Sequence, residues 1–384
     1  MLPDRIPSFG RKPLAVLMAL TFALTACSAG NSTQSSAPAS ATAAASQPAG
    51  SGAAATYDPS EKLPDASGEL QSVKLAQSIP SLSFSPLIIA LDRNFFGYQG
   101  LKTEFVELQS GATALQAIVG GSIDLVDSAS TEVASAIAKG TGIQAIENTI
   151  MMTLQVCVRK DYAEKAGVTA DSPLADRLKA LKGATIGITG PGAVSDKAMR
   201  YLLIKFGGLD PNTDTTITQV GGAAAMSGAL DANQIQAFLL SPPNCAQTKE
   251  GMVLVEPGDV DTFKNYTHEV LYGLKTWIDA NPEIATKAAT AIAMGNNYIL
   301  QYPDEALKIL QAQFSKVDPS VVENAFNKTI LPQVKEDGKF DAAMWDNTNT
   351  VLVDAGIIDK AVDTAEGVVW TNKYIGDASL PYKK

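Results

Sequence analysis

A unit of strand, hydroxyl-rich turn and helix recurs along the chain, and this recurrence constrains the fold more than any other feature of the sequence. Residues 72–77 (SVKLAQ) are predicted as a strand, and the next helix begins at Ser85 and Pro86, an N-cap residue and an N1 proline. The strand predicted at 101–108 alternates polar and apolar residues and leads into a helix at 113–120. Strands that alternate with helices in this way indicate parallel sheets flanked by helices, so we expect an α/β fold.

The same order of elements returns in the middle third of the chain, which indicates a second lobe. A Gly-rich turn at residues 189–195 joins a predicted strand to a predicted helix there. The foldable region, residues 70–384, is longer than one hydrophobic core usually serves, so two lobes are expected. The predicted organisation is lobe one (70–154), lobe two (155–255), and a return through the hinge to C-terminal helices that pack on lobe one (256–384).

The N-terminus has the pattern of an export signal. Basic residues precede an apolar run at 13–24 that is too short for a permanent membrane span. Residues 24–27 (LTAC) resemble the lipobox of bacterial lipoproteins, in which the cysteine becomes the acylated first residue of the mature chain. This resemblance implies a signal peptide at 1–26 and lipidation of Cys27, while a plain cleavage site with an incidental cysteine remains the alternative.

The composition of the chain excludes several classes of partner and of binding site. Residues 27–69 contain the lipobox cysteine and an Ala- and Ser-rich linker that cannot bury enough apolar surface to fold. The net charge of −10 argues against nucleic acid as a partner and against electrostatic binding to anionic lipid. His268 is the only histidine and no cysteine spacing is typical of a metal site, so we expect neither a metal nor a cofactor. Cys157 and Cys245 are either a disulfide or two buried free thiols, and the sequence leaves both open.

Small hydroxyl residues gather in the turns that follow the predicted strands. Solutes of open parallel sheets bind at the carboxyl ends of strands, beside helix N-termini whose free N–H groups can donate to a polar or anionic group. Helix capping is the more ordinary role for any one of these residues. Their recurrence at equivalent places favours a shared binding site. The turn residues are Ser81, Ser83, Ser85, Ser110, Thr113, Ser128, Ser130, Thr131 and Ser195.

Signatures of catalysis are weak in this sequence. The turn at residues 190–192 (GPG) lacks the ending of a phosphate-binding loop and the spacing of a dinucleotide fingerprint. Asp124 and Asp127 lie three positions apart in one short strand and point to opposite faces, so surface or capping roles are expected. No candidate nucleophile has a plausible base. The sequence therefore favours binding without turnover.

Five stretches occur in the order found in one family and together cover most of the body. They resemble the type II periplasmic substrate-binding proteins of the sulfonate, taurine and nitrate transporter group, also called the NMT1/THI5-like group. Asn233 and Gln236 depart from this pattern, because the family commonly has Gly and Asp there. The matching stretches are 83–101 (SFSPLIIALDRNFFGYQGL), 116–125 (QAIVGGSIDL), 178–188 (LKALKGATIGI), 228–238 (GALDANQIQAF) and 272–282 (YGLKTWIDANP).

The resemblance implies a two-lobed type II periplasmic-binding-protein fold, in which each lobe is a parallel-dominated sheet flanked by helices. It also implies a monomeric, exported receptor, lipid-anchored at the outer face of the cytoplasmic membrane or in the periplasm, that clamps a small solute and delivers it to an ABC permease and its ATPase. Closure would occur by hinge motion near residues 150–155 and 255–270. The implied solute-binding residues are Ser81, Ser83, Phe84, Ser110, Gly111, Thr113, Ser128, Ser130, Thr131, Ala193, Ser195, Ser241 and Pro242.

The solute itself is not fixed by the sequence. Members of the group bind sulfonates, taurine, nitrate, pyrimidines or aromatic acids, yet the expected turns hold few basic residues. Lys197 and Arg200 are as readily explained as solvated side chains, which favours a neutral or weakly anionic solute or an anion held by backbone N–H groups. Phe84, Met151 and Met152 are more readily explained as core than as an apolar wall for a ring. A same-fold enzyme of the pyrimidine-synthase type and a solute-sensing lipoprotein without a transport role are the alternative functions.

Overall fold

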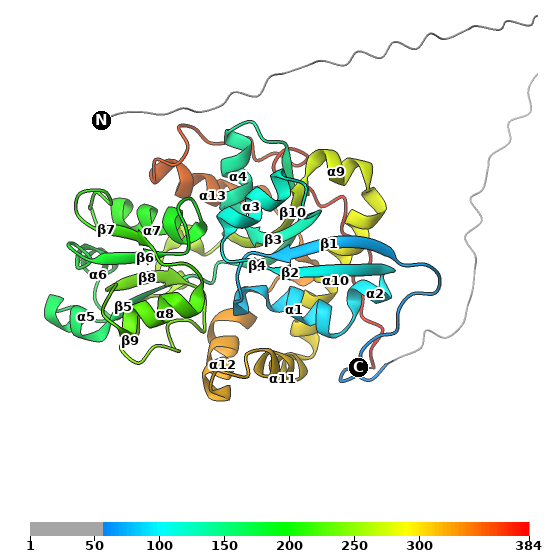
Figure 1. The fold of residues 1–384 in the computed structure, drawn as a ribbon, viewed down its shortest axis with the longest axis horizontal. Coiled ribbons are helices and arrows are strands. Elements are labelled where there is room, and N and C mark those ends of the chain that lie inside the picture. Colours follow the sequence, from blue (N-terminus) through cyan, green and yellow to red (C-terminus); the bar gives the residue numbers. More distant parts are fainter. Residues whose placement is uncertain (1–56, 384) are drawn as a thin grey trace, which may run out of the picture. The chain divides into compact units, whose positions relative to one another are not determined.

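The computed structural model describes residues 57–383. Two five-stranded sheets, each flanked by helices, form two lobes (Figure 1). The predicted two-lobed α/β fold is confirmed. The signal peptide, Cys27 and most of the linker lie outside the described residues. Within residues 57–383, no helix combines the length and the apolar character needed to cross a membrane.

Lobe one is built on a sheet with the strand order β2-β1-β3-β10-β4. Strands β2, β1 and β3 pair in parallel, and β10 runs antiparallel between β3 and β4. Its central strands are buried over almost their whole length, as expected for a sheet covered on both faces. The strands are β1 (Gln71–Gln77), β2 (Leu101–Glu107), β3 (Leu125–Ala129), β4 (Ile143–Met151) and β10 (Thr267–Leu274).

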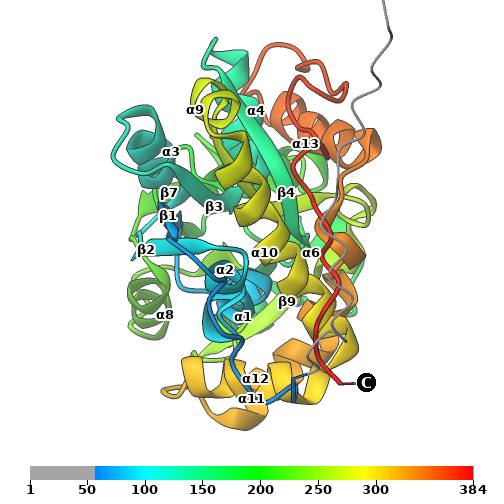
Figure 2. The same cartoon turned by 90° about the vertical axis from the view of Figure 1, so that its right-hand side faces the viewer.

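Helices from distant parts of the sequence cover this sheet. The long helix α10 packs against α1 so closely that a Cβ atom at Gly295 would lie 2.1 Å from the carbonyl oxygen of Pro86. Figure 2 shows the C-terminal segment passing along α10, where Asn297 donates a hydrogen bond to the carbonyl oxygen of Ala378. The helices of lobe one and of the return are α1 (Ser85–Asp92), α2 (Phe95–Tyr98), α3 (Gly111–Val119), α4 (Ser130–Ala138), α9 (Lys275–Ala280), α10 (Pro282–Gln301), α11 (Pro303–Gln313), α12 (Pro319–Ala325) and α13 (Ala342–Asp354).

Two helix starts in lobe one differ from the sequence-based prediction. The helix predicted from Thr113 begins at Gly111, because Ser110 is its N-cap and accepts a hydrogen bond from the Thr113 N–H. A second helix, α2, follows the one predicted from Ser85, because Asn94, whose φ of 63° is left-handed, separates α1 from α2. Local hydrogen bonding and one left-handed residue therefore set boundaries that apolar periodicity did not reveal.

Lobe two repeats the plan with the strand order β7-β6-β8-β5-β9. Strands β7, β6 and β8 are parallel, and β5 runs antiparallel between β8 and β9. The sulfur atoms of Cys157, on β5, and Cys245, after β8, are 2.07 Å apart in a disulfide. The elements are β5 (Gln155–Arg159), β6 (Thr185–Ile188), β7 (Thr216–Gln219), β8 (Ala237–Leu240), β9 (Gly251–Val255), α5 (Lys160–Ala166), α6 (Leu174–Lys179), α7 (Val194–Lys205) and α8 (Ala223–Asp231).

Three parts of the chain connect the lobes. Residues 152–154 lead from β4 into β5, and residues 256–266 lead back from β9 to β10. Helix α13 packs against α4 of lobe one and α7 of lobe two, and Lys205 forms a 2.8 Å ion pair with Asp354 at its end. The C-terminal helices were expected to pack on lobe one, and the last of them, α13, contacts lobe two as well.

Candidate functional site

A small chamber lies between the two lobes, beside the segment that leads from β4 to β5. Its volume is about 20 Å³, close to the space that one water molecule needs. A larger solute therefore requires the lobes to move apart. The lining residues are Ser78, Ile79, Gly111, Ser128, Glu132, Leu154, Thr189, Ala193, Val194, Ser195, Leu240, Ser241, His268 and Glu269.

Each wall of the chamber comes from the end of a strand or the start of a helix. Lobe one supplies Ser128 from the end of β3 and Gly111 from the first turn of α3. Lobe two supplies the start of α7 and the residue after β8, Ser241. Glycine is needed at position 111, because a Cβ atom there would lie 2.5 Å from Oε1 of Glu132. The site therefore lies where open α/β sheets usually bind their ligands.

A line of polar contacts runs through the chamber wall from lobe two to lobe one, and its step from His268 to Glu269 is a contact without a hydrogen bond. The Oγ atom of Ser241 lies 2.7 Å from Oγ1 of Thr153, which lies 3.1 Å from Nδ1 of His268. Nε2 of His268 is 3.4 Å from Oε1 of Glu269, and the Ser83 hydroxyl donates to that same oxygen at 3.0 Å. Burial lowers the pKa of His268 to about 3, so its ring is neutral and the contact with Glu269 is not an ion pair.

Glu132 and Lys197 face each other across the lobe boundary. Glu132 lies in the first turn of α4, and Lys197 lies in the first turns of α7. Burial raises the pKa of Glu132, while the Lys197 ammonium and the Val194 N–H act in the opposite direction. Burial likewise lowers the pKa of Lys197, whose ammonium donates to the carbonyl oxygen of Thr131 at 3.1 Å. Lys197 is 3% exposed, so of the two interpretations that the sequence left open, the solvated one does not apply to it.

Further carboxyl groups are buried behind the chamber in the sheet of lobe one. Burial raises the pKa of Asp127 to about 8, and burial together with the charge of Asp127 raises the pKa of Glu147 and of Glu269 well above the usual range. The Thr149 hydroxyl contacts both Asp127 and Glu147. The surface or capping role expected for Asp127 is wrong, because the residue is fully buried within β3.

Several residues predicted for the site do meet at the chamber. They come from both lobes, and they share small side chains at strand ends or helix starts. Their convergence supports the argument from recurring turns, because separate segments contribute to one cavity. These residues are Gly111, Ser128, Ala193, Ser195 and Ser241.

The other predicted residues lie outside the chamber lining. Ser83 is next to it through its hydrogen bond to Glu269, and Ser110 lies close to Gly190 of lobe two. Ser81 is an N-cap residue, Thr113 is exposed, and Phe84 is in the hydrophobic core, as the core interpretation of its ring expected. The remaining three have partners elsewhere. The Ser130 hydroxyl donates to Thr267, the Thr131 carbonyl accepts from Lys197, and the Pro242 carbonyl accepts from the Leu82 N–H.

The sequence argument missed the charged residues of the chamber. Glu132 was overlooked because a glutamate in the first turn of a helix is commonly a solvated residue that favours the helix dipole. His268 and Glu269 were overlooked because they belong to a return strand, far in sequence from the turns of lobe one. The polar pair at 268–269 inside an otherwise apolar strand was the one available signal.

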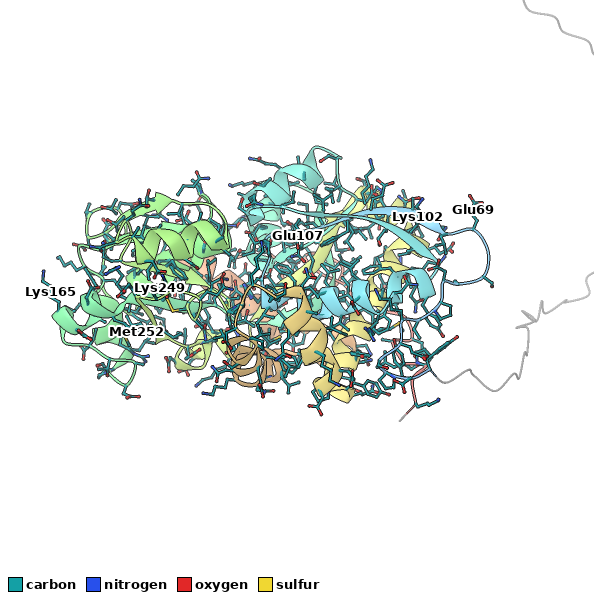
Figure 3. All side chains as sticks on the ribbon, turned by 60° about the horizontal axis from the view of Figure 1, so that its bottom comes forward. Glu69, Lys102, Glu107, Lys165, Lys249 and Met252 are labelled. Atoms are coloured by element: carbon teal, nitrogen blue, oxygen red, sulfur yellow. A yellow bond between two sulfur atoms is a disulfide. The ribbon has the colours of Figure 1, made fainter. Side chains whose placement is uncertain are left out.

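A larger groove lies outside the chamber, on the same boundary between the lobes. Its volume is about 870 Å³, and residues of both lobes and of the α11–α12 connection line it. Figure 3 labels Glu107, which lines this groove at the end of β2 that faces lobe two, whereas Lys102 lies near the other end of that strand. Gln77 and Asn244 also line the groove, and each lies within three residues of a chamber residue. The groove and the chamber are therefore lined by neighbouring positions of the same chain segments.

In the part of the chain that the structure describes, no three His, Cys, Asp or Glu side chains are gathered closely enough to hold a metal ion. The carboxyl groups of the chamber are instead placed to accept hydrogen bonds from separate donors. Together with the neutral His268 ring, they make the chamber a site for polar recognition.

Comparison with known proteins identifies the family. Residues 66–312 match the model of the NMT1-like family. No curated protein matches the chain by sequence.

Comparison with solved structures shows the fold. A protein from Bordetella bronchiseptica RB50 is 27% identical, with a TM-score of 0.68 over 80% of this chain and 96% of that one. The periplasmic nitrate-binding protein NrtA from Synechocystis PCC 6803 is 20% identical, with a TM-score of 0.62 over 81% and 88% of the two chains. The alkanesulfonate-binding protein SsuA from Xanthomonas axonopodis pv. citri, bound to MOPS, is 17% identical, with a TM-score of 0.60 over 78% and 97%.

Proposed function

The chain belongs to the NMT1-like family, and we propose that it is the extracytoplasmic solute receptor of an ABC importer. In this role it captures a small solute between its lobes and delivers it to a permease and its ATPase. It acts as a monomer and performs no chemistry on the solute. The family assignment and the nitrate- and sulfonate-binding proteins that share the fold support this role.

One observation carries the proposal: residues of both lobes line a single chamber beside the hinge. Gly111 and Glu132 come from lobe one, whereas Ser195 and Ser241 come from lobe two. A solute that contacts both sets of residues binds the closed arrangement better than the open one, and so it shifts the equilibrium toward closure. The permease then distinguishes loaded receptors from empty ones by their shape.

The two connecting segments are suited to act as the hinge. Residues 152–154 and 256–266 contain no strand, and both join one sheet to the other. A change of backbone angles in a few residues there would separate the lobes while each sheet stays intact. Helix α13 contacts both lobes, so its packing on α4 or on α7 must also adjust. The extent of opening is therefore set by α13 as well as by the hinge.

The lipobox places the receptor at a membrane surface. Acylation of Cys27 would hold the chain at the outer face of the cytoplasmic membrane or in the periplasm, with the linker as a tether. Cys27→Ser should leave the precursor unprocessed, which the mass of the purified chain would reveal. Normal processing of that variant would remove the case for an anchor.

A thermal-shift screen tests the receptor role. The chain from residue 27 onward, with Cys27→Ser, would be heated in the presence of sulfonates, nitrate, pyrimidines, aromatic acids and amines. A solute at a hundred times its Kd should stabilise the protein by about 2.7 kcal/mol. A second measurement of the radius of gyration should show compaction with that same solute. The absence of both effects with every class would contradict the receptor role.

A further inference from the structure

The chamber is richer in acceptors than a receptor for an anion requires. Two carboxyl groups line it, those of Glu132 and Glu269, and a neutral imidazole and the Ser128 hydroxyl lie beside them. Lys197 is the cation that faces this group from lobe two, and its ammonium already donates to a lobe-one carbonyl oxygen. An anionic solute would therefore enter against two carboxyl groups. A positively charged donor would meet the acceptors of the lobe-one wall.

Glu269 has one oxygen held in place and one left for a solute. Its Oε1 atom accepts a hydrogen bond from Ser83 and lies beside Nε2 of His268. Its Oε2 atom has no hydrogen-bond partner among residues 57–383, and the residue is only 3% exposed. A buried carboxyl oxygen without a partner loses its hydration and gains nothing in return. A donor supplied by the solute would remove this deficit.

Glu132 occupies the place where an anion would otherwise bind. The start of α7 presents free N–H groups and the positive end of the helix dipole, which favour an anion. The carboxyl group of Glu132 is already there, because the Val194 N–H and the Lys197 ammonium both act on it. Its Oε1 atom is also without a hydrogen-bond partner in the described part of the chain. The carboxyl group of Glu132 therefore takes the place of an anion at the start of α7, and in the described part of the chain its Oε1 atom can still accept a hydrogen bond from a solute.

From these contacts we propose that the solute carries a positively charged nitrogen group that donates hydrogen bonds to Glu269 and Glu132, such as a protonated amine or an amidinium. Glu269 supplies the main interaction, because no Lys or Arg among residues 57–383 compensates it, whereas Glu132 already faces Lys197. The outer groove takes the rest of the solute. The inference rests on the receptor role and specifies its substrate class.

Proton release on binding is a further consequence. The titratable groups around Glu269 are Asp127, Glu132 and the neutral His268, and burial, together with the neighbouring carboxyl groups of Asp127 and Glu132, favours its protonated form. A cationic solute favours the ionised form, so its binding should expel a proton. The affinity for such a solute should therefore increase as the pH rises through the range in which Glu269 holds its proton. An anionic solute should show the opposite trend.

Matched pairs of probes test the inference. Benzamidine with benzoate, and propylamine with propanesulfonate, have similar size and opposite charge. We expect the cationic members to raise the Tm of the wild-type protein and the anionic members to leave it unchanged. Glu269→Gln should weaken binding of the cationic member by about 10- to 100-fold, as expected for loss of a charge-assisted hydrogen bond. Glu147→Gln is the control, because Glu147 is buried in the same sheet but does not line the chamber, and it should bind as the wild type does.

The outcomes separate the two proposals. Binding of an anionic member, unaffected or strengthened by Glu269→Gln, would overturn the cationic solute and leave the receptor role standing. A shift with Zn²⁺ alone would also overturn it. No shift with any probe, amine or anion, would count against both proposals. If Glu269→Gln does not fold, calorimetry of the wild-type protein in buffers of different ionisation enthalpy decides the question. The inference requires that binding releases a proton. Proton uptake on binding, or no proton transfer, would contradict it.

Discussion

The two lobes share a strand order but treat their buried charges differently. In lobe two, Arg177 forms a 2.7 Å ion pair with Asp259, and Arg200 forms a 2.6 Å ion pair with Asp196. In lobe one, the carboxyl groups of Asp127 and Glu147 are fully buried, and no Lys or Arg forms an ion pair with them in the described structure. Unpaired buried carboxyl groups reduce stability, whereas paired ones need not. Lobe two is therefore built for stability, and lobe one keeps polar groups that serve the chamber.

The disulfide accentuates this difference, and its removal should have the largest effect. It joins residues 88 positions apart in lobe two, so its loss should cost roughly 4 kcal/mol through the larger entropy of the unfolded chain. We expect the double variant Cys157→Ser/Cys245→Ser to unfold lobe two before lobe one, which would divide one urea transition into two. Far-UV circular dichroism during urea unfolding measures this effect.

Reductant gives the corresponding control for the disulfide. Dithiothreitol should destabilise the wild-type protein by a similar amount and should leave the double serine variant unchanged. The mass of the unreduced chain supplies an independent check, because two free thiols add two hydrogen atoms. Equal stability with and without reductant, or the heavier mass, would show that lobe two does not depend on this bond.

The buried carboxyl groups of lobe one should make its stability fall as the pH rises. Asp127 keeps its proton to about pH 8 in the folded state, whereas in the unfolded chain it releases the proton near pH 4. Between these values the unfolded chain binds fewer protons, so raising the pH favours unfolding. Relative to Asp127→Asn, the wild-type protein should lose up to about 1.4 kcal/mol per pH unit between pH 5 and pH 7.

Urea unfolding of both proteins across this pH range tests the difference. Asparagine keeps an acceptor for the Thr149 hydroxyl, which lies 3.0 Å from Oδ2 of Asp127, so the variant should retain the local hydrogen bond. Asp196→Asn in lobe two is the comparison, because its carboxyl group forms an ion pair with Arg200, whereas no Lys or Arg of the described residues pairs with Asp127. If the free energy of unfolding changes with pH in the same way for the wild-type protein and for Asp127→Asn, then Asp127 does not hold a proton in the folded state as inferred here.

Much of the fold follows from local patterns in the sequence. The alternation of strands and helices predicts α/β lobes, because side-chain period and turn residues act over a few positions. The placement of β10 beside β3 and β4 could not be derived in that way. It depends on the chain returning from lobe two after more than one hundred residues, and no local pattern encodes such a pairing. The bridging position of α13 was missed for the same reason.

The same distinction between local and distant information decides which residues of the site could be predicted. Gly111, Ser128 and Ser195 could be predicted because they lie at a strand end or a helix start, where ligands of such sheets bind. Glu269 and Glu132 could not, because their roles depend on burial that only the assembled lobes create. Lys197 illustrates the difficulty, since an exposed and a buried lysine look the same in one sequence. The charge of the chamber, and hence the class of solute, needed the structure.

The smallest expected effect lies at the boundary that both lobes share. Ser241→Ala removes the 2.7 Å contact between Ser241 of lobe two and Thr153 of the connecting segment. The loss of one buried hydrogen bond should cost about 1 kcal/mol. Ser227→Ala is the matched control, because the Ser227 hydroxyl donates to the carbonyl oxygen of Asn244 within lobe two alone.

Both substitutions should therefore lower the Tm slightly. They should differ in their effect on solute affinity, because only Ser241→Ala is expected to affect closure of the lobes. Because Thr153 belongs to the connecting segment, we expect the loss of its contact with Ser241 to favour the open arrangement and to weaken solute binding about five-fold, as 1 kcal/mol implies. Ser227→Ala should leave solute affinity unchanged, because its hydrogen bond does not depend on the lobe boundary. Small-angle scattering should then show a larger radius of gyration for Ser241→Ala alone. Equal affinities and radii for the two variants would mean that this contact stabilises lobe two and has no part in closing the receptor.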